Sequence, residues 1–307
     1  MKRALIITNP LAASAGTRAL EAARSRLEAR GLEVVVEKSC ALGDGERLAR
    51  AAVADGVDVV IAHGGDGTVN DVLAGLAGTG RPLGLLPGGT GNVLAGNLGV
   101  PRSPVAAADT ILAGALRVID LGRLRTSAGT WHFASNCAAG FAADLMAATA
   151  PRHKRRFGVA AYVAQAVLIA ANLVRVSSRV EVDGVVHEGR TSTVIVANCS
   201  DIVPGLLRLG ANIAPDDGLL DVAVLDVASY AVGLRLLWRM LQRRPDADSA
   251  ITFYRGRVVR ITTEPVLPAQ ADGEPTGATP MTIDLLPGAL TVLVPAVQRP
   301  PRGSSAR

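Results

Sequence analysis

A short apolar run that ends in a glycine-rich turn constrains this chain most. Five of the six residues 57–62 are apolar, and His63-Gly64-Gly65-Asp66-Gly67-Thr68 follows at once. A β-type run that breaks into three glycines within four residues predicts a strand, a tight turn and then a helix. Glycines in such a turn let backbone N–H groups approach an anion, and Thr68 is expected to cap the helix that follows.

Asp66 is the unusual member of this turn. A carboxylate beside a phosphate is repelled by about 4 kcal/mol per charge pair at ~4 Å and an effective dielectric of ~20. Its presence therefore indicates one of two roles. Either a divalent cation bridges it to the phosphates, or it handles a proton. The turn thus predicts metal-assisted phosphate chemistry.

A second glycine-rich turn, Pro87-Gly88-Gly89-Thr90-Gly91-Asn92, follows the apolar run 82–86, and Asn9-Pro10 follows the run 4–8. Ligands of parallel sheets bind beyond the carboxyl ends of the strands, so we expect these three junctions on one rim. None contains the lysine of a Walker A loop. Phosphate charge would then be neutralised by Mg²⁺ and backbone dipoles.

The first 121 residues predict an α/β domain with a parallel sheet and helices on both of its faces, because strand and helix signals alternate there. Strands are predicted at 4–8, 33–37, 57–62 and 82–86, and helices at 18–30, 45–55, 69–78 and 93–98.

Residues 122–297 instead predict a mainly β domain, a sandwich, with a hairpin turn at Val182-Asp183-Gly184-Val185. Its β-rich runs are 130–137, 179–182, 191–198, 219–225, 257–263 and 281–286, and two helical segments, 157–174 and 229–244, interrupt them. The polar tail 298–307 is expected to be disordered.

The formal net charge of +5 is concentrated at 152–156 and 235–244. Aromatic residues make up 3 % of the chain, too few to interleave with these basic residues, so we expect no nucleic-acid partner. The uncharged segment 157–174 and the amphipathic segment 229–244 could each lie on an anionic lipid surface, and packing within the protein is the alternative. The three cysteines (Cys40, Cys137 and Cys199) are expected to be buried, reduced thiols, which points to the cytoplasm.

Together these motifs resemble the diacylglycerol kinase and sphingosine kinase superfamily of lipid kinases. The resemblance extends over nearly the whole chain, through 136–146, Ala214-Pro215-Asp216-Asp217-Gly218-Leu219-Leu220-Asp221 and Asp272-Gly273-Glu274. It implies an N-terminal domain like that of phosphofructokinase and NAD kinase and a C-terminal β-sandwich. ATP and Mg²⁺ would bind in the cleft between them.

The resemblance also implies roles for individual residues. Glu274 would be the general base with Asp272 beside it, and Asp66 would belong to the same catalytic group. The nucleotide would be held by Asn9, Pro10, Ser39, Gly64, Gly65, Asp66, Gly67, Thr68, Gly89, Thr90 and Asn92. A structural magnesium ion would be bound by Asp217 with the carbonyls of Ala214 and Leu219, and Asp120 could join a metal–water network.

Two positions depart from the pattern. Val93 stands where bacterial diacylglycerol kinases commonly carry Asp, which removes one carboxylate from that network. The segment Gly140-Phe141-Ala142-Ala143-Asp144 lacks the usual Gly-Phe-Asp-Ala order and is more similar to sphingosine kinases, which makes Asp144 the candidate for headgroup recognition.

The sequence therefore predicts an ATP-dependent lipid kinase that phosphorylates diacylglycerol or a related lipid alcohol. It would act in transient contact with an anionic membrane, at the inner face of the cell membrane, as a monomer or a homodimer. The alternatives are a sphingoid-base kinase, a soluble NAD or sugar-phosphate kinase, and an inactive homologue that binds lipid or nucleotide. The second turn and the 214–221 stretch argue against the soluble kinase.

Overall fold

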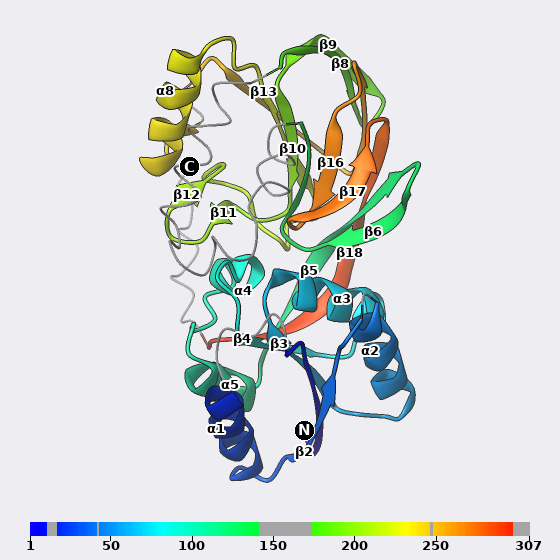
Figure 1. The fold of residues 1–307 in the computed structure, drawn as a ribbon, viewed down its shortest axis with the longest axis vertical. Coiled ribbons are helices and arrows are strands. Elements are labelled where there is room, and N and C mark those ends of the chain that lie inside the picture. Colours follow the sequence, from blue (N-terminus) through cyan, green and yellow to red (C-terminus); the bar gives the residue numbers. More distant parts are fainter. Residues whose placement is uncertain (11–16, 42, 141–173, 246–247, 297–307) are drawn as a thin grey trace, which may run out of the picture.

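The computed structural model describes residues 1–10, 17–41, 43–140, 174–245 and 248–296. Strands and helices alternate at first, and strands dominate afterwards (Figure 1). The elements of the first part are β1 Arg3–Thr8, α1 Thr17–Glu28, β2 Glu33–Lys38, α2 Asp44–Ala54, β3 Val59–Gly64, α3 Asp66–Leu76, β4 Leu83–Pro87, α4 Val93–Asn97, α5 Pro104–Ala113 and β5 Ala115–Thr126.

The second part consists mainly of short strands. Its elements are β6 Gly129–Phe133, β7 Asn136–Gly140, β8 Val176–Val182, β9 Val185–Thr191, β10 Thr193–Ala197, β11 Asp201–Val203, β12 Leu207–Arg208, β13 Leu220–Leu225, α8 Tyr230–Leu241, β14 Ile251–Gly256, β15 Val258–Glu264, β16 Pro268–Ala271, β17 Glu274–Ala278 and β18 Met281–Val294.

The first four strands form a parallel array in the order β2-β1-β3-β4. The strands β3 and β4 are buried along their whole length, as near-continuous apolar runs require. In Figure 1, α1 and α5 lie on one side of these strands and α2 and α3 on the other. The predicted α/β arrangement is confirmed, and the element ends up to residue 98 differ from the prediction by three residues at most.

The long strand β18 joins the two parts of the chain. It pairs in parallel with β4 at Val292 and Leu83, and it pairs antiparallel with β5 and β15. A single ten-stranded sheet, β2-β1-β3-β4-β18-β15-β8-β9 with β5 and β6 attached, therefore runs through both parts. The sequence analysis did not foresee this continuity, because pairing between distant strands leaves no local signal.

A second sheet, in the order β14-β13-β10-β7-β16-β17, packs against the antiparallel part of the first. Buried side chains such as Phe133, Val194 and Ile261 fill the space between them, so the predicted sandwich is confirmed. The predicted hairpin is confirmed too, with Asp183 and Gly184 at positive φ. The β-rich run 130–137 contains parts of two strands, β6 and β7.

The second predicted helical segment is confirmed as α8, which begins after the N-cap Ser229. The basic cluster 152–156, the segment 157–174, Asp144 and the tail 298–307 lie outside the described residues. No helix in the described ranges is long and apolar enough to span a bilayer.

The cysteines differ in their surroundings. Cys137 and Cys199 are buried as predicted, and burial raises the pKa of both thiols. The prediction for Cys40 is wrong, because this residue is exposed. It follows the end of the edge strand β2, in the turn that leads to α2.

Candidate active site

The carboxyl ends of the parallel strands bring the three predicted junctions to one rim. The backbone N–H of Asn9 donates to the His63 carbonyl at 3.4 Å, and that of Ser39 donates to the Thr8 carbonyl at 2.9 Å. The second turn is attached to the first, because the N–H of Gly88 donates to the Gly64 carbonyl at 2.8 Å. Ser39 is buried, and Pro10 lies exposed beside Asn9.

The two glycine-rich turns touch backbone to backbone. A Cβ atom placed on Gly89 would lie 2.5 Å from the Cα of Gly65. A Cβ placed on Gly91 would lie 2.5 Å from Oδ2 of Asp66. Contacts this short leave no room for a side chain, so these glycines are required by close approach. The result is a narrow cradle bounded by backbone from both turns.

Asp66 ties the second turn to the first. Its Oδ2 accepts the N–H of Asn92 at 3.0 Å, and its Oδ1 accepts the N–H of Val93 at 2.6 Å. These amides begin α4, so the carboxylate occupies a position where a helix favours an anion. This explains a carboxylate in a glycine-rich turn without a metal ion. The backbone N–H groups of Asn92 and Val93, which the sequence analysis expected to bind a phosphate, therefore donate to Asp66 instead.

Asn92 holds the second turn in shape. Its φ is 50°, and its side-chain amide accepts from the N–H of Gly89 and donates to the Gly89 carbonyl, at 3.0 and 2.7 Å. Asparagine tolerates this left-handed conformation better than most residues. Thr90 lies half-buried between the two.

Thr68 does not cap the helix, contrary to the prediction. The helix α3 begins two residues earlier, at Asp66, with the extended residue Gly65 as its N-cap and no side-chain cap. Thr68 therefore lies inside the first turn, where it is buried, and its Oγ1 has no hydrogen-bond partner among the described residues. A buried hydroxyl of this kind is a candidate to meet a ligand or an ordered water.

His63 is a residue of the rim that the sequence analysis did not single out. It is buried directly before the first turn, with Nδ1 at 2.8 Å from Oγ1 of Thr8. Burial lowers its pKa, so the imidazole is neutral at pH 7. Its Nε2 has no partner in the described part of the chain. The sequence feature that could have identified His63 is its position directly before Gly64 in the first glycine-rich motif.

The Asp272-Gly273 dipeptide forms the two-residue turn of the β16–β17 hairpin, with φ of 45° and 92°. The carboxylate of Asp272 accepts three backbone N–H groups, from Ala134, Ser135 and Asn136, at 2.7, 2.9 and 2.8 Å. Asp272 therefore anchors the hairpin to the start of β7. It lies beside the predicted base, as expected, in a positioning role.

The pKa of Asp272 is shifted by burial and, to a smaller extent, by charge from the first glycine-rich turn. Burial raises the pKa of Asp272 to about 6, the three N–H bonds oppose that rise, and the negative charge of Asp66 adds to it. At pH 7 the carboxyl group of Asp272 is still ionised in most molecules. The two acidic motifs thus converge from opposite parts of the chain.

Glu274 completes this convergence. It is the first residue of β17, and a Cβ placed on Gly67 would lie 3.0 Å from its Oε1. The carboxylate of Glu274 thus lies over the first turn of α3, where the helix dipole favours negative charge. The structure brings together Asp66, Gly67 and Glu274.

Gln270 is a further polar residue that the sequence analysis missed. It is buried, its Nε2 donates to Oδ1 of Asn136 at 3.0 Å, and its Oε1 accepts the N–H of Gly273 at 2.6 Å. It braces the hairpin that carries Glu274. The signal was a lone glutamine between Ala269 and Ala271 in an otherwise apolar strand.

Asp120 and Asp217, which were predicted to bind a magnesium ion, have hydrogen-bond partners within the protein. Asp120 accepts the N–H groups of Gly218 and Gly288 at 2.9 and 2.7 Å, so it links the 214–219 loop to β18. Asp217 accepts the N–H of Leu219 at 3.1 Å, and its other oxygen is paired with the Arg255 guanidinium. In this arrangement Arg255 already supplies the positive charge that the ion would provide.

Replacing Arg255 tests whether this guanidinium takes the place of the ion. Arg255 also pairs with Asp221 at 2.9 Å, so the change Arg255→Met should leave two carboxylates without their shared cation. We expect a loss of about 1–2 kcal/mol in unfolding free energy, because the pairs are partly exposed. Millimolar Mg²⁺ should recover part of this loss. The measurement is thermal unfolding with MgCl₂ or with NaCl of equal ionic strength.

Wild-type protein is the control in that experiment, and its melting temperature should not respond to Mg²⁺. A rise in the wild-type melting temperature that disappears in Asp217→Asn would show that the ion displaces Arg255.

The rim fits a nucleotide phosphate with a hydrated magnesium ion. Oγ1 of Thr68 and Nε2 of His63 have no hydrogen-bond partner within the described ranges, and neither turn contains lysine or arginine. Among the described residues, no group of three His, Cys, Asp or Glu side chains could hold a metal alone.

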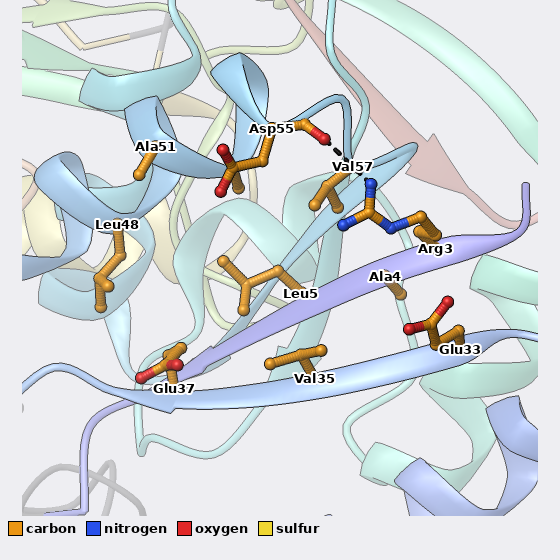
Figure 2. Close-up of a pocket in the computed structure, with 11 residues that line it drawn as sticks. Arg3, Ala4, Leu5, Glu33, Val35, Glu37, Leu48, Ala51, Asp55 and Val57 are labelled. Atoms are coloured by element: carbon orange, nitrogen blue, oxygen red, sulfur yellow. Dashed lines mark hydrogen bonds between the residues drawn. The ribbon is translucent and has the colours of Figure 1, made fainter.

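A hollow of about 270 Å³ lies elsewhere, between β1, β2 and α2 (Figure 2). Leu5, Val35 and Leu48 form its apolar floor, and Arg3 at its edge donates to the Asp55 carbonyl at 3.0 Å. None of the predicted site residues lines it. It therefore plays no part in the candidate active site.

Comparison with known proteins identifies the family of this chain. Residues 3–124 match the family model of the diacylglycerol kinase catalytic domain, and residues 135–294 match that of the YegS C-terminal NAD kinase beta sandwich-like domain. A diacylglycerol kinase of Mycobacterium tuberculosis is 33 % identical over 94 % of this chain and 94 % of its own length. A diacylglycerol kinase of Bacillus subtilis is 29 % identical, over 91 % of this chain and 92 % of its own.

Solved structures agree on the fold. Two structures of Bacillus anthracis proteins described as diacylglycerol kinases have TM-scores of 0.81 and 0.75 against this chain. Their sequence identities are 24 % and 22 %, each covers 96 % of this chain, and the coverage of their own chains is 96 % and 97 %. At this identity the likeness is one of fold.

Proposed function

This chain belongs to the diacylglycerol kinase family and is a phosphotransferase with an alcohol acceptor; we propose that it transfers the γ-phosphate of ATP to the hydroxyl of diacylglycerol or a related lipid alcohol. The observation that carries this proposal is the position of the Glu274 carboxylate over Gly67, at the first turn of α3. An acid is thereby held where a helix N-terminus would meet the transferred phosphate.

Glu274 would act on the acceptor hydroxyl. As that oxygen forms its bond to the γ-phosphorus, the bond to the β,γ-bridging oxygen breaks and ADP leaves. The hydroxyl proton must go to a base within hydrogen-bond reach, and Glu274 would take it. Asp272 would act through Glu274, because it anchors the hairpin turn directly before it.

The two turns would bind and orient the triphosphate. The absence of side chains at Gly65 and Gly89 would let an anion come close to the backbone of both turns, and Asp66 keeps the turns together. Magnesium, when bound with ATP, would supply the positive charge that the turns lack. Asn9 and Ser39 would border the nucleotide on the same rim.

An acceptor panel tests the proposal. Purified protein is given γ-labelled ATP and Mg²⁺ together with diacylglycerol micelles, sphingosine or NAD, and the labelled products are separated. We expect label in the phosphorylated diacylglycerol. Label in sphingosine alone would select the sphingoid-base alternative, and label in NAD alone the soluble kinase. ATP binding without transfer to any acceptor would select the inactive homologue.

A further inference from the structure

The helix α8 presents two apolar stripes on opposite sides. Leu236 and Met240 are buried in a cluster between α8 and the second sheet. Tyr230, Leu234 and Trp238 follow each other at four-residue spacing on the other side, with 45 %, 38 % and 61 % of their surfaces exposed. A helix packed on one face needs only one apolar stripe, so the second is available for a partner.

Arginines alternate with this stripe along α8 and continue just beyond its C-terminus. Arg235 and Arg239 share one acid, Asp248, at 2.8 and 3.3 Å, and Arg243 lies 3.9 Å from Asp201. Arg244 is exposed and has no ion pair among the described residues. Even with Asp246 included, arginines outnumber acids in the segment 235–248. The stripe therefore suits an anionic partner.

The helix is also connected to the candidate active site. It contacts β12, while the neighbouring β11 contacts α4 at the second glycine-rich turn. Asn97 of α4 exchanges two hydrogen bonds of 2.9 Å with the backbone of Asp201, the residue that faces Arg243. In Figure 1, α8 lies at the outer side of the second part, beyond β11 and β12 as seen from α4. A partner bound to α8 would therefore hold the candidate active site at a fixed distance from the partner's surface.

We propose that the Tyr230–Leu234–Trp238 stripe docks onto the surface of an anionic lipid bilayer, with Arg244 facing the headgroups. This inference rests on the proposed function, because a lipid acceptor resides in a bilayer. The residue types fit: tryptophan and tyrosine favour the membrane–water interface, and leucine favours the acyl region next to it. A helix of 12 residues is too short to span a bilayer and lies in the plane of the interface.

Binding to vesicles tests the docking without any catalysis. The double variant Leu234→Gln/Trp238→Gln is mixed with vesicles of phosphatidylglycerol and phosphatidylcholine, without ATP or diacylglycerol, and sedimented. We expect an affinity about tenfold below wild type. Arg244→Gln should lower the affinity for these vesicles about fivefold. It should leave the affinity unchanged for pure phosphatidylcholine vesicles or at high salt. Thermal unfolding verifies that the variants fold.

The matched control is Leu116→Gln, a leucine of β5 that is 60 % exposed and far from α8 in the chain. It should bind vesicles like wild type. Unchanged vesicle binding of the double variant would overturn the proposal. So would a wild-type dimer, measured by sedimentation equilibrium, that the double variant converts to monomer, because the stripe would then bind a second copy.

Activity measurements separate this inference from the proposed function. The double variant should phosphorylate a short-chain, water-soluble diacylglycerol at the wild-type rate. On vesicles that contain diacylglycerol, its rate of phosphorylation should be about tenfold lower than that of wild type. No transfer to either form by wild type would refute the proposed function alone. Equal rates of variant and wild type on vesicles would refute the docking alone.

Discussion

Replacing Glu274 by Gln should lower kcat for lipid phosphorylation by about 10²–10⁴-fold. A carboxamide has the shape of the carboxylate but cannot accept the hydroxyl proton. Affinity for ATP should stay the same or rise slightly, because the change removes a negative charge that faces the phosphates. The measurements are steady-state kinetics on diacylglycerol micelles and calorimetric titration with Mg²⁺-ATP.

Glu33→Gln is the matched control for that change. Glu33 is an exposed glutamate at the amino end of β2, at the opposite edge of the parallel strands from the rim. It should keep wild-type kcat. If Glu274→Gln kept more than half of the wild-type kcat, another group would have to remove the proton. If ATP affinity fell as far as kcat, Glu274 would be a binding residue rather than a base.

Gly89→Ala is expected to weaken ATP binding at least tenfold and to destabilise the fold by about 1–3 kcal/mol. The new Cβ would lie 2.5 Å from the Cα of Gly65, so it would meet backbone rather than a movable side chain. The two turns must then separate, and the paired hydrogen bonds between Gly89 and Asn92 would be strained. Nucleotide titration and denaturant unfolding measure the two effects.

The control for this prediction is Gly189→Ala on β9. A Cβ there would meet nothing within 4 Å, and the residue does not have a positive φ. It should leave both ATP affinity and stability close to wild type. Wild-type ATP affinity in Gly89→Ala would show that the phosphates do not lie in the cradle between the turns.

The first sheet joins the two parts of the chain. The strands β5 and β18 pair along most of their length, and β18 also pairs with β4 and β15. Glu274 lies on β17 in the second sheet, and its Oε1 lies 3.0 Å from the position of a Cβ placed on Gly67. If Glu274 is the base, this proximity would reduce the entropy lost on reaching the transition state.

Local features of the fold followed from the sequence alone. The alternation of apolar runs and amphipathic segments predicted the strands and helices up to residue 98, because burial on a sheet and on a helix imposes different periods. Glycine positions predicted the strand-to-helix turns, where backbone segments approach closely, and the Asp183-Gly184 hairpin, where few other residues adopt the positive φ. The order of the glycine-rich and acidic motifs was sufficient for the family resemblance.

Long-range partners were decided by the tertiary structure. The sequence could not show that Asp66 binds the amides of α4, that Thr68 lies inside its helix, or that Arg255 neutralises Asp217. Each depends on the pairing and packing of segments distant in the chain. The local sequence around a charged residue does not show which residue will be its partner. The meeting of Glu274 with Gly67 is of the same kind, since the two residues lie at the start of β17 and in the first turn of α3, which are far apart in the chain.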